Sequence, residues 1–243
     1  MSKRIGFVVP FDFALDREYW DYASTEASLH ITRTPFRAGL VSPELISAVS
    51  DPAVVAEATR SLAKIEPDVV VYACTSGSFS EGLDGERRLR ETMLRAGAKA
   101  AITTSGALIE ALHALDVSRV AVATPYVEAI GRRLVPFLES AGFQPLSLVN
   151  MELQDGICDV GDDEVVRLAE RALRPGAEAL FLSCTNLPTG HLLAPLERRL
   201  GIPVLSANQV TMWAALRMVG ARAAVEDQIL FQRAAPGMSA AVR

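Results

Sequence analysis

The chain has 243 residues, of which half are apolar and 22% are charged, and its formal net charge is −5 at pH 7. This composition excludes a disordered chain, and no apolar run approaches the roughly 18 to 20 residues of a membrane span. The acidic balance, with no basic cluster larger than Arg87, Arg88 and Arg90, argues against nucleic acid as a partner. The length fits one wide domain or two of about 110 to 120 residues each.

The beginning of the chain and its cysteine content predict a cytoplasmic protein without a metal. The opening MSKRIGFVVPF is followed by Asp12 and Asp16 too early for a secretory signal, and no small-residue cleavage site follows. Three cysteines cannot form a disulfide framework, and no histidine lies at ligand spacing to a cysteine or to another histidine. We therefore expect free thiols in a reducing compartment.

Short runs rich in Val, Ile, Ala and Leu alternate with longer helical periods along the chain. This alternation indicates β-α units and a largely parallel sheet. In DPAVVAEATRSLAKIEPD, Asp51 fits an N-cap and Pro52 the first helical position. The seven predicted strands are Arg4 to Val9, Leu29 to Thr34, Val69 to Ala73, Ala100 to Thr103, Arg119 to Thr124, Ala179 to Ser183 and Pro203 to Leu205.

The second half of the chain repeats the first with a period of about 100 to 115 residues, which suits two fused α/β lobes. IGFVVPF corresponds to VAVATPY, and VVAEATRSL corresponds to EVVRLAERAL, before Cys74 and Cys184 respectively. Ser105 and Asn208 occupy equivalent places, each in a polar break between a strand and a helix. We expect a first lobe over residues 1–115 with part of the C-terminal helical region, a second over 116–220, and a tail over 221–243 whose end FQRAAPGMSAAVR frays.

Cys74 and Cys184 each follow a predicted strand. Ligands of open α/β sheets bind at the carboxyl ends of the strands. If the lobes pack with pseudo-twofold symmetry, both thiols face one interlobe cleft. A single cysteine after a strand is more often a buried apolar residue, but two at equivalent positions favour a functional site.

Small polar residues follow each thiol, in ACTSGSF and SCTNLP. We expect the backbone N–H groups of these turns to lower the thiol pKa, so that the cysteine acts as a nucleophile or base. Neighbouring side chains add donors suited to a carboxylate, or to the enediolate formed when a proton leaves the adjacent carbon. The predicted donors are Thr75, Ser76, Thr185 and Asn186.

Five other residues are interpreted individually. Tyr126 ends the first strand of the second half and suits a phenol that donates to a substrate carboxylate. Asp12, at the equivalent mouth of the first half, is interpreted as the cap of a helix over residues 16–22. Cys158 has no counterpart in the other half, and we interpret it as structural, together with His30 and His113.

The sequence resembles the aspartate/glutamate racemase superfamily, and most of all its branch of maleate cis-trans isomerases and arylmalonate decarboxylases. ACTSGSF, TTSGALIEALHAL, ATPYVEAIGRRLVPFLESAGF and SCTNLP carry the resemblance in this order, within about residues 4–220. It implies a pseudo-symmetric two-lobed α/β fold, each lobe a mostly parallel sheet flanked by helices, with the site in the interlobe cleft. It also implies a reaction that needs neither metal nor organic cofactor.

The resemblance implies roles for the two thiols. In an isomerase, Cys74 would add as a thiolate to an alkene carbon, the C–C bond would rotate, and Cys184 would supply or take the proton. In a racemase, the two thiols would flank an α-carbon. The decarboxylases carry glycine at the position of Cys74, so the presence of this cysteine counts against a pure decarboxylase.

By the same resemblance, Thr75, Ser76 and Tyr126 would donate to one substrate carboxylate, with the amides after Cys184 contributing. Two asparagines that the isomerases usually carry are missing, and Phe11 and Phe13 stand near the first of these positions. Unless these two are core residues, the change favours a substrate with an apolar portion over maleate.

Three functions remain open from the sequence. The leading prediction is a cofactor-independent isomerase or racemase that acts on a small carboxylic acid through both cysteines. One alternative is an arylmalonate-type decarboxylase, in which Cys184 protonates the enediolate and Cys74 is a bystander. The other is a non-catalytic protein that holds a small acid in its cleft. In each case the partner is a small carboxylate, and we expect a homo-oligomer.

Overall fold

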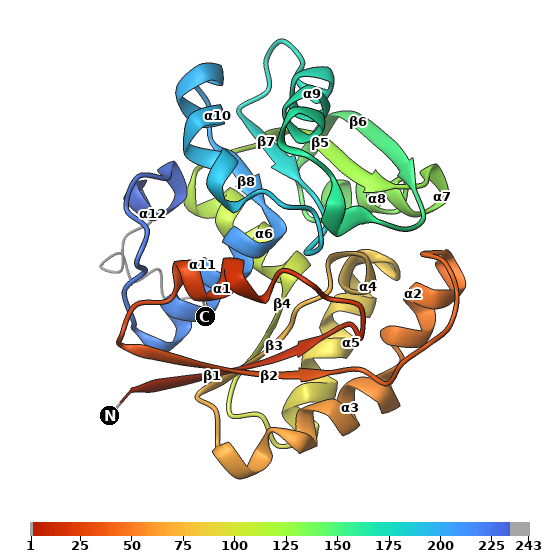
Figure 1. Ribbon diagram of the computed structural model, residues 1–243, viewed down its shortest axis with the longest axis vertical. Helices are drawn as coiled ribbons and strands as arrows, with labels where there is room; N and C mark the ends of the chain where they lie inside the picture. Colours follow the sequence, from red (N-terminus) through yellow and green to blue (C-terminus); the bar gives the residue numbers. More distant parts are fainter. Residues whose placement is uncertain (1, 234–243) are drawn as a thin grey trace.

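The computed structural model describes residues 2–233, whose strands form two separate four-stranded sheets (Figure 1). The first sheet has the order β2-β1-β3-β4 and the second the order β6-β5-β7-β8, and all of these pairings are parallel. The identical order confirms the duplication and the two-lobed α/β fold. The strands are β1 (Lys3–Val9), β2 (Ala27–Arg33), β3 (Val69–Tyr72), β4 (Ala101–Thr103), β5 (Arg119–Tyr126), β6 (Gln144–Leu153), β7 (Ala179–Leu182) and β8 (Val204–Ser206).

Helices connect successive strands, as parallel pairing requires. Within residues 2–233, none of them is long and apolar enough to cross a bilayer. Between β1 and β5 they are α1 (Asp16–Tyr22), α2 (Pro43–Val49), α3 (Pro52–Ser61), η1 (Ala63–Ile65), α4 (Thr75–Phe79), α5 (Gly82–Arg95) and α6 (Thr104–Ala114). After β5 they are α7 (Glu128–Gly131), α8 (Leu134–Ser140), η2 (Ile157–Asp159), α9 (Asp162–Ala172), η3 (Gly190–Leu192), α10 (Leu193–Leu200), α11 (Ala207–Val219) and α12 (Ile229–Arg233).

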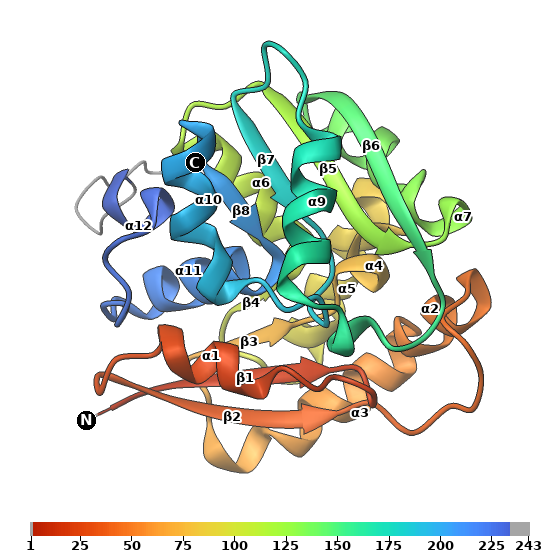
Figure 2. The ribbon, with the colours of Figure 1, turned by 45° about the horizontal axis from the view of Figure 1, so that its top comes forward.

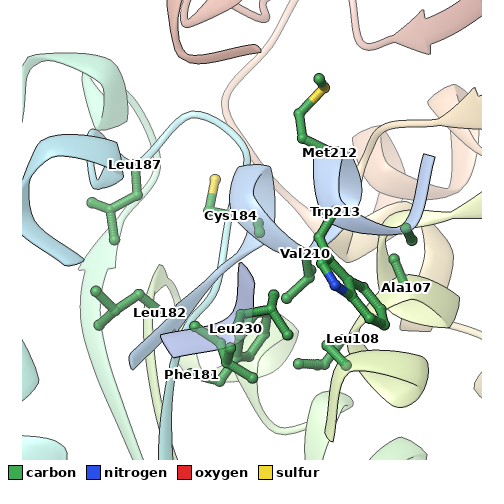
Figure 3. Close-up of a cluster of buried hydrophobic side chains, with 14 of the residues drawn as sticks. Ala107, Leu108, Phe181, Leu182, Cys184, Leu187, Val210, Met212, Trp213 and Leu230 are labelled. Atoms are coloured by element: carbon green, nitrogen blue, oxygen red, sulfur yellow. The ribbon is translucent and has the colours of Figure 1, made fainter. Parts of the chain in front are cut away.

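Helices α6 and α11 join the two halves. They pack against each other, and α11 also contacts β1 and β3 of the first sheet and β8 of the second. One hydrophobic cluster therefore extends through both sheets. Figure 3 shows the part of it in which Trp213 of α11 lies beside Leu108 of α6, with Phe181 of β7 at the lower left and Cys184 at the upper left.

The seven predicted strands agree with the observed ones to within two residues, and Asp51 caps α3 by accepting from the Ala53 N–H at 2.7 Å. Strand β6 was not predicted, because it is a half-exposed edge strand without a clear apolar alternation. Helix α2 was also missed, although Ser42 followed by Pro43 is a start signal, and the Ser42 hydroxyl accepts from the Leu45 N–H at 3.2 Å.

The C-terminal segment differs from the expected tail. Residues 221–233 pack onto the protein, where the Ala224 N–H donates to the Tyr22 carbonyl at 2.9 Å and Leu230 of α12 is fully buried. Of the stretch that was expected to fray, residues 231–233 belong to α12, and residues 234–243 lie outside the described part of the chain.

Candidate active site

A small cavity lies where the carboxyl ends of β1, β3, β5 and β7 converge between the two sheets. Its volume is about 50 Å³, and both Cys74, after β3, and Cys184, after β7, line it. Figure 2 shows the loop after β7 (cyan) descending beside the loop between β1 and α1 (red). The fold therefore brings together the two thiols, which are separated by more than a hundred residues of sequence.

The other predicted site residues also line this cavity. They are Thr75, Ser76, Tyr126, Thr185 and Asn186. All are buried except Asn186, which is half-buried. The Thr75 Oγ1 is enclosed and has no hydrogen-bond partner in the described structure. Since buried hydroxyls are normally paired, this group is available to a ligand.

Cys74 begins helix α4 in an ordinary extended conformation, with φ −139° and ψ 111°. Its Sγ lies 3.9 Å from the Ser76 hydroxyl. Burial raises the pKa of this thiol, and hydrogen bonds from the Gly77 N–H and the Ser76 hydroxyl oppose the rise. The carboxylate of Asp12 raises the pKa further.

Cys184 has a strained backbone, with φ 95°, which is rare for a residue with a Cβ. The Asn186 N–H donates to its Sγ at 3.4 Å. Burial raises the pKa of this thiol to about 12, against the lowering effect of hydrogen bonds from the Tyr126 hydroxyl and the Asn186 N–H. The charges of Cys74 and Asp12 act in the same direction as burial.

The expectation of lowered thiol pKa values is therefore wrong for the ligand-free cavity. The turns do supply N–H donors, but loss of hydration at two buried sulfurs outweighs them. Both thiols are protonated at neutral pH, and Cys184 is suited to deliver a proton.

Ser105 and Asn208 occupy the equivalent places predicted from the repeat, each as the second residue of its helix. The Ser105 hydroxyl donates to the carbonyl of Thr75 at 3.2 Å, and the Asn208 Nδ2 donates to the carbonyl of Thr185 at 2.9 Å. Each therefore holds the turn just after one cysteine.

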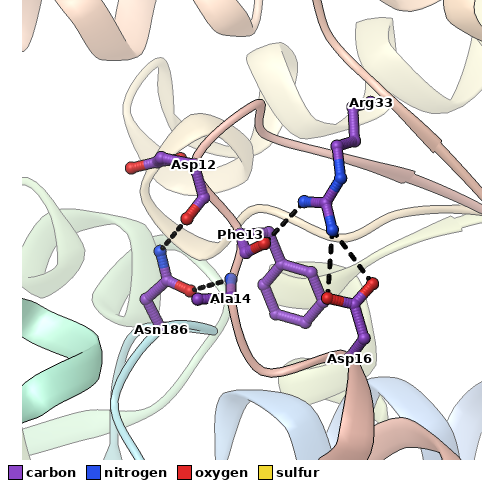
Figure 4. Close-up of polar contacts among 6 residues, drawn as sticks. All are labelled: Asp12, Phe13, Ala14, Asp16, Arg33 and Asn186. Carbon is purple, nitrogen blue, oxygen red and sulfur yellow. Dashed lines mark hydrogen bonds and ion pairs between the residues drawn. The ribbon is translucent and has the colours of Figure 1, made fainter.

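Asp12 does not cap α1, as the sequence had suggested. The N-cap of α1 is Leu15, without a side-chain cap, and Asp12 lines the cavity at its mouth. The backbone carbonyl of Asp12 accepts from Asn186 Nδ2 at 3.1 Å (Figure 4). Of the two phenylalanines beside it, Phe11 lines the cavity, whereas Phe13 is buried in the core.

Asp12 is the charged side chain among the lining residues, which include no Lys, Arg or His. Asp12 is an exposed residue, so its loss of hydration is partial; this loss raises the pKa of Asp12, and the positive charge of Arg33 opposes that rise. Arg33 itself is bound to the carboxylate of Asp16 at 3.0 Å and to the carbonyl of Phe13 (Figure 4). A substrate carboxylate in this cavity would therefore be held by neutral donors.

Sequence reasoning missed the apolar wall of the cavity. Most of this wall comes from α2 and the segment before it, which were not predicted to lie near the cysteines. Its residues are Val41, Leu45, Ile46, Val49 and Ile157. The start signal at Ser42 and Pro43 could have revealed the helix, but not its position in the fold.

The residues interpreted as structural lie outside the cavity lining. Cys158 is half-buried in η2, His30 lies 3.1 Å from the Ser28 hydroxyl, and the His113 ring lies 4.8 Å from that of Phe143. Within residues 2–233, no three His, Cys, Asp or Glu side chains are grouped as ligands of a metal ion would be.

Comparisons with known proteins identify relatives of this chain. The family model described as arylmalonate decarboxylase matches residues 39–230. A maleate isomerase from Nocardia farcinica is 32% identical over 237 residues, which is 92% of each chain. An arylmalonate decarboxylase from Bordetella bronchiseptica is 33% identical over 186 residues, covering 75% of this chain and 77% of that one.

Solved structures give the same result. A double mutant of arylmalonate decarboxylase in a liganded form matches with a TM-score of 0.87 at 30% identity, covering 95% of this chain and 99% of that one. A cysteine-to-serine mutant of the Nocardia farcinica maleate cis-trans isomerase, with a covalently bound succinylcysteine intermediate, matches with a TM-score of 0.79 at 27% identity and coverages of 91% and 94%. The alternative of a non-catalytic binding protein has no support among these relatives. The chain therefore belongs to the arylmalonate decarboxylase family of enzymes, in the branch of the aspartate/glutamate racemase superfamily that contains maleate isomerases and arylmalonate decarboxylases.

Proposed function

We propose that the protein is a cofactor-independent isomerase or racemase that acts beside the carboxylate of a small acid through Cys74 and Cys184. The observation that carries the proposal is that two thiols, from equivalent turns of the two halves, line one cavity. A single proton donor would suffice for decarboxylation. Two thiols can remove and return a proton, or combine covalent addition with proton transfer.

The substrate carboxylate would bind to the hydroxyls of Thr75, Ser76 and Tyr126. Thr75 supports this role most directly, because its buried Oγ1 has no partner in the described structure. Neutral donors fixed in a buried cavity stabilise the negative charge that develops on the carboxylate as an enediolate forms. They also leave the thiols as the groups that exchange protons.

For an unsaturated acid, Cys74 would first release its proton to solvent. The resulting thiolate would form a C–S bond at one alkene carbon, and the π electrons would move toward the carboxylate. The S–H group of Cys184 would then protonate the neighbouring carbon, so that the former double bond can rotate. Return of that proton to the Cys184 thiolate and cleavage of the C–S bond would release the isomer and restore both groups. The succinylcysteine in the Nocardia farcinica relative is an adduct of this kind.

The lining supports an acid with an apolar portion over a small dicarboxylate. The apolar wall defined above and the adjacent Phe11 offer no donors from their side chains. A second carboxylate would meet the negative charge of Asp12 without a lining cation to offset it. We therefore place the apolar substituent of the substrate against α2.

The test is proton NMR in D2O with alkyl- and aryl-substituted unsaturated acids, α-substituted acids, and maleate for comparison. We expect isomerisation or α-deuteration without loss of carbon dioxide. Cys74→Ala and Cys184→Ala should each lower turnover by about 1,000-fold or more. Cys158→Ala is the matched control, because this third thiol does not line the cavity, and it should keep the wild-type rate. Wild-type turnover in either of the first two variants would overturn two-thiol catalysis.

A decarboxylase is the second candidate. The raised pKa of Cys184 favours it, since a thiol that stays protonated can protonate an enediolate left by loss of carbon dioxide. In that case substituted malonates would release carbon dioxide, and Cys74→Gly would remain active. Carbon dioxide release that survives in Cys74→Gly would replace the isomerase proposal with this one.

A further inference from the structure

We propose that Glu18, on helix α1 of the first half, is a positioning residue that holds the Cys184 loop (residues 183–190) of the second half. One oxygen of its carboxylate, Oε1, accepts from the backbone N–H groups of Thr189 at 2.8 Å and Gly190 at 2.9 Å. The other, Oε2, accepts from the Asn208 Nδ2 at 2.7 Å. Glu18 does not line the cavity, so it would act through the loop.

Asn208 extends this support to the beginning of the loop. Its Nδ2 donates both to Glu18 and to the carbonyl of Thr185, the residue after Cys184, at 2.9 Å. Asn208 is fully buried at the start of α11. The carboxylate of Glu18 therefore fixes the far end of the loop directly and the end next to the thiol through one side chain.

The loop needs such support because Cys184 is strained. Its φ of 95° is one that only glycine adopts readily, and such a conformation persists only where the surrounding contacts determine it. Cys74, the equivalent thiol, has an unstrained φ of −139° and leads directly into helix α4. The two thiol turns thus differ in backbone strain, and Glu18 and Asn208 would maintain the strained conformation at Cys184.

Two further contacts fit this interpretation. Asn186 lies within the loop, and its Oδ1 accepts from the Ala14 N–H at 2.9 Å while its Nδ2 donates to the Asp12 carbonyl (Figure 4). Its carboxamide is therefore occupied by the segment that leads into α1. A Cβ at position 190 would lie 3.3 Å from the Glu18 carboxyl carbon, so glycine allows the carboxylate to approach the backbone.

The test measures the rate at which iodoacetamide labels Cys184 relative to Cys74, by mass spectrometry of the purified full-length protein at pH 8. In Glu18→Gln, the NH2 group of the glutamine cannot accept a hydrogen bond. At least one of the three donors, the Thr189 N–H, the Gly190 N–H or the Asn208 Nδ2, therefore loses its partner, which frees the loop. With the loop free, Cys184 gains solvent and its pKa falls. We expect Cys184 to label about tenfold faster while the rate at Cys74 changes less than about twofold. Glu18→Asp keeps the charge but shortens the reach, and it should behave like Glu18→Gln.

The matched control is Glu197→Gln. Glu197 also accepts from two backbone N–H groups, those of Val204 and Ile229, but neither of them belongs to the Cys184 loop. The Glu197→Gln variant should be less stable than wild type, but the ratio of the labelling rates at Cys184 and Cys74 should not change. If Glu18→Gln does not fold, Asn208→Ala removes the same support from the other side and should shift the ratio in the same direction.

An unchanged ratio in Glu18→Gln or Asn208→Ala, a wild-type ratio in Glu18→Asp, or an equal shift in Glu197→Gln would each overturn the inference. Once a substrate is known, Glu18→Gln should lower kcat by about 100-fold with little change in KM, because a displaced proton donor affects the reaction more than binding. The inference rests on the proposed function only for this kinetic arm. If Cys184→Ala remains active while Glu18→Gln still changes the labelling ratio, the proposed function fails and the positioning role stands.

Discussion

Replacing Gly77 with alanine should disturb both the stability of the protein and the surroundings of Cys74. Gly77 lies in α4, and an ideal Cβ there would overlap the hydroxyl of Tyr72 and lie 3.1 Å from the Cys74 Sγ. Tyr72 cannot withdraw freely, because it is fully buried and its hydroxyl donates to the carbonyl of Val49 at 3.1 Å. The added methyl group must therefore break this hydrogen bond or shift α4.

The size of the effect follows from three contributions. Overpacking a well-packed core costs about 1 to 3 kcal/mol, and leaving a buried hydroxyl without its partner costs about 1 to 3 kcal/mol more. Alanine is favoured over glycine in a helix by up to about 1 kcal/mol, which offsets part of this. We expect Gly77→Ala to lower the free energy of unfolding by about 2 to 4 kcal/mol, measured by urea denaturation.

Removing the overlapping oxygen should relieve the clash. The double variant Tyr72→Phe/Gly77→Ala is expected to be about 1 to 2 kcal/mol more stable than Gly77→Ala, whereas Tyr72→Phe alone should cost about 1 kcal/mol. Iodoacetamide labelling of Cys74 should change in Gly77→Ala and return toward wild type in the double variant. Stability of Gly77→Ala within about 0.5 kcal/mol of wild type, or no relief from Tyr72→Phe, would refute the reasoning.

Two further predictions concern the charges of the cavity. Burial raises the pKa of Cys184 to about 12 from its ordinary value of 9.0, so its stabilising contribution is complete below pH 9 and is lost as the pH rises toward 12. Between pH 9 and 11, wild type should therefore lose about 2 to 3 kcal/mol more unfolding free energy than Cys184→Ala; parallel losses in urea titrations would contradict this. Because the charge of Asp12 raises the pKa of both cavity thiols, Asp12→Asn should shift the pH profiles of iodoacetamide labelling at Cys74 and Cys184 to lower pH and speed labelling about two- to fivefold at pH 8. Unshifted profiles in low salt would show that this carboxylate does not act on the thiols.

Much of the fold could be predicted because its signals are local. Seven strands appear as short apolar runs, and Asp51 marks the N-cap of α3. The repeat pairs Cys74 with Cys184 without any knowledge of the fold. Strand β6 lacks such a signal, because an edge strand that is half-exposed on both faces has no reason to alternate. The repeat could have indicated it, since β6 is the counterpart of β2, but that correspondence was not used in the prediction.

The sequence predicted which residues line the site, but it predicted the wrong direction for the pKa shifts of the two thiols. The sequence shows that N–H donors and hydroxyls follow each thiol, and these donors are present. How far each sulfur is removed from water depends on helix α2, on Asp12 and on the sheet of the other half, none of which is a neighbour of that cysteine in sequence. Burial is a sum over the whole surrounding structure, and here it outweighs the local donors.

By itself the sequence determined the two-lobed α/β fold, the pairing of the thiols, and the hydroxyls that surround them, because periodicity, capping residues and an internal repeat act over short stretches of chain. Only the tertiary structure decided that Asp12 faces the cavity, that α2 forms its apolar wall, and that Glu18 reaches the backbone of Thr189 and Gly190. These contacts join residues as far as 172 positions apart, and no local pattern specifies them. They exist because the carboxyl ends of strands from two sheets meet at one place.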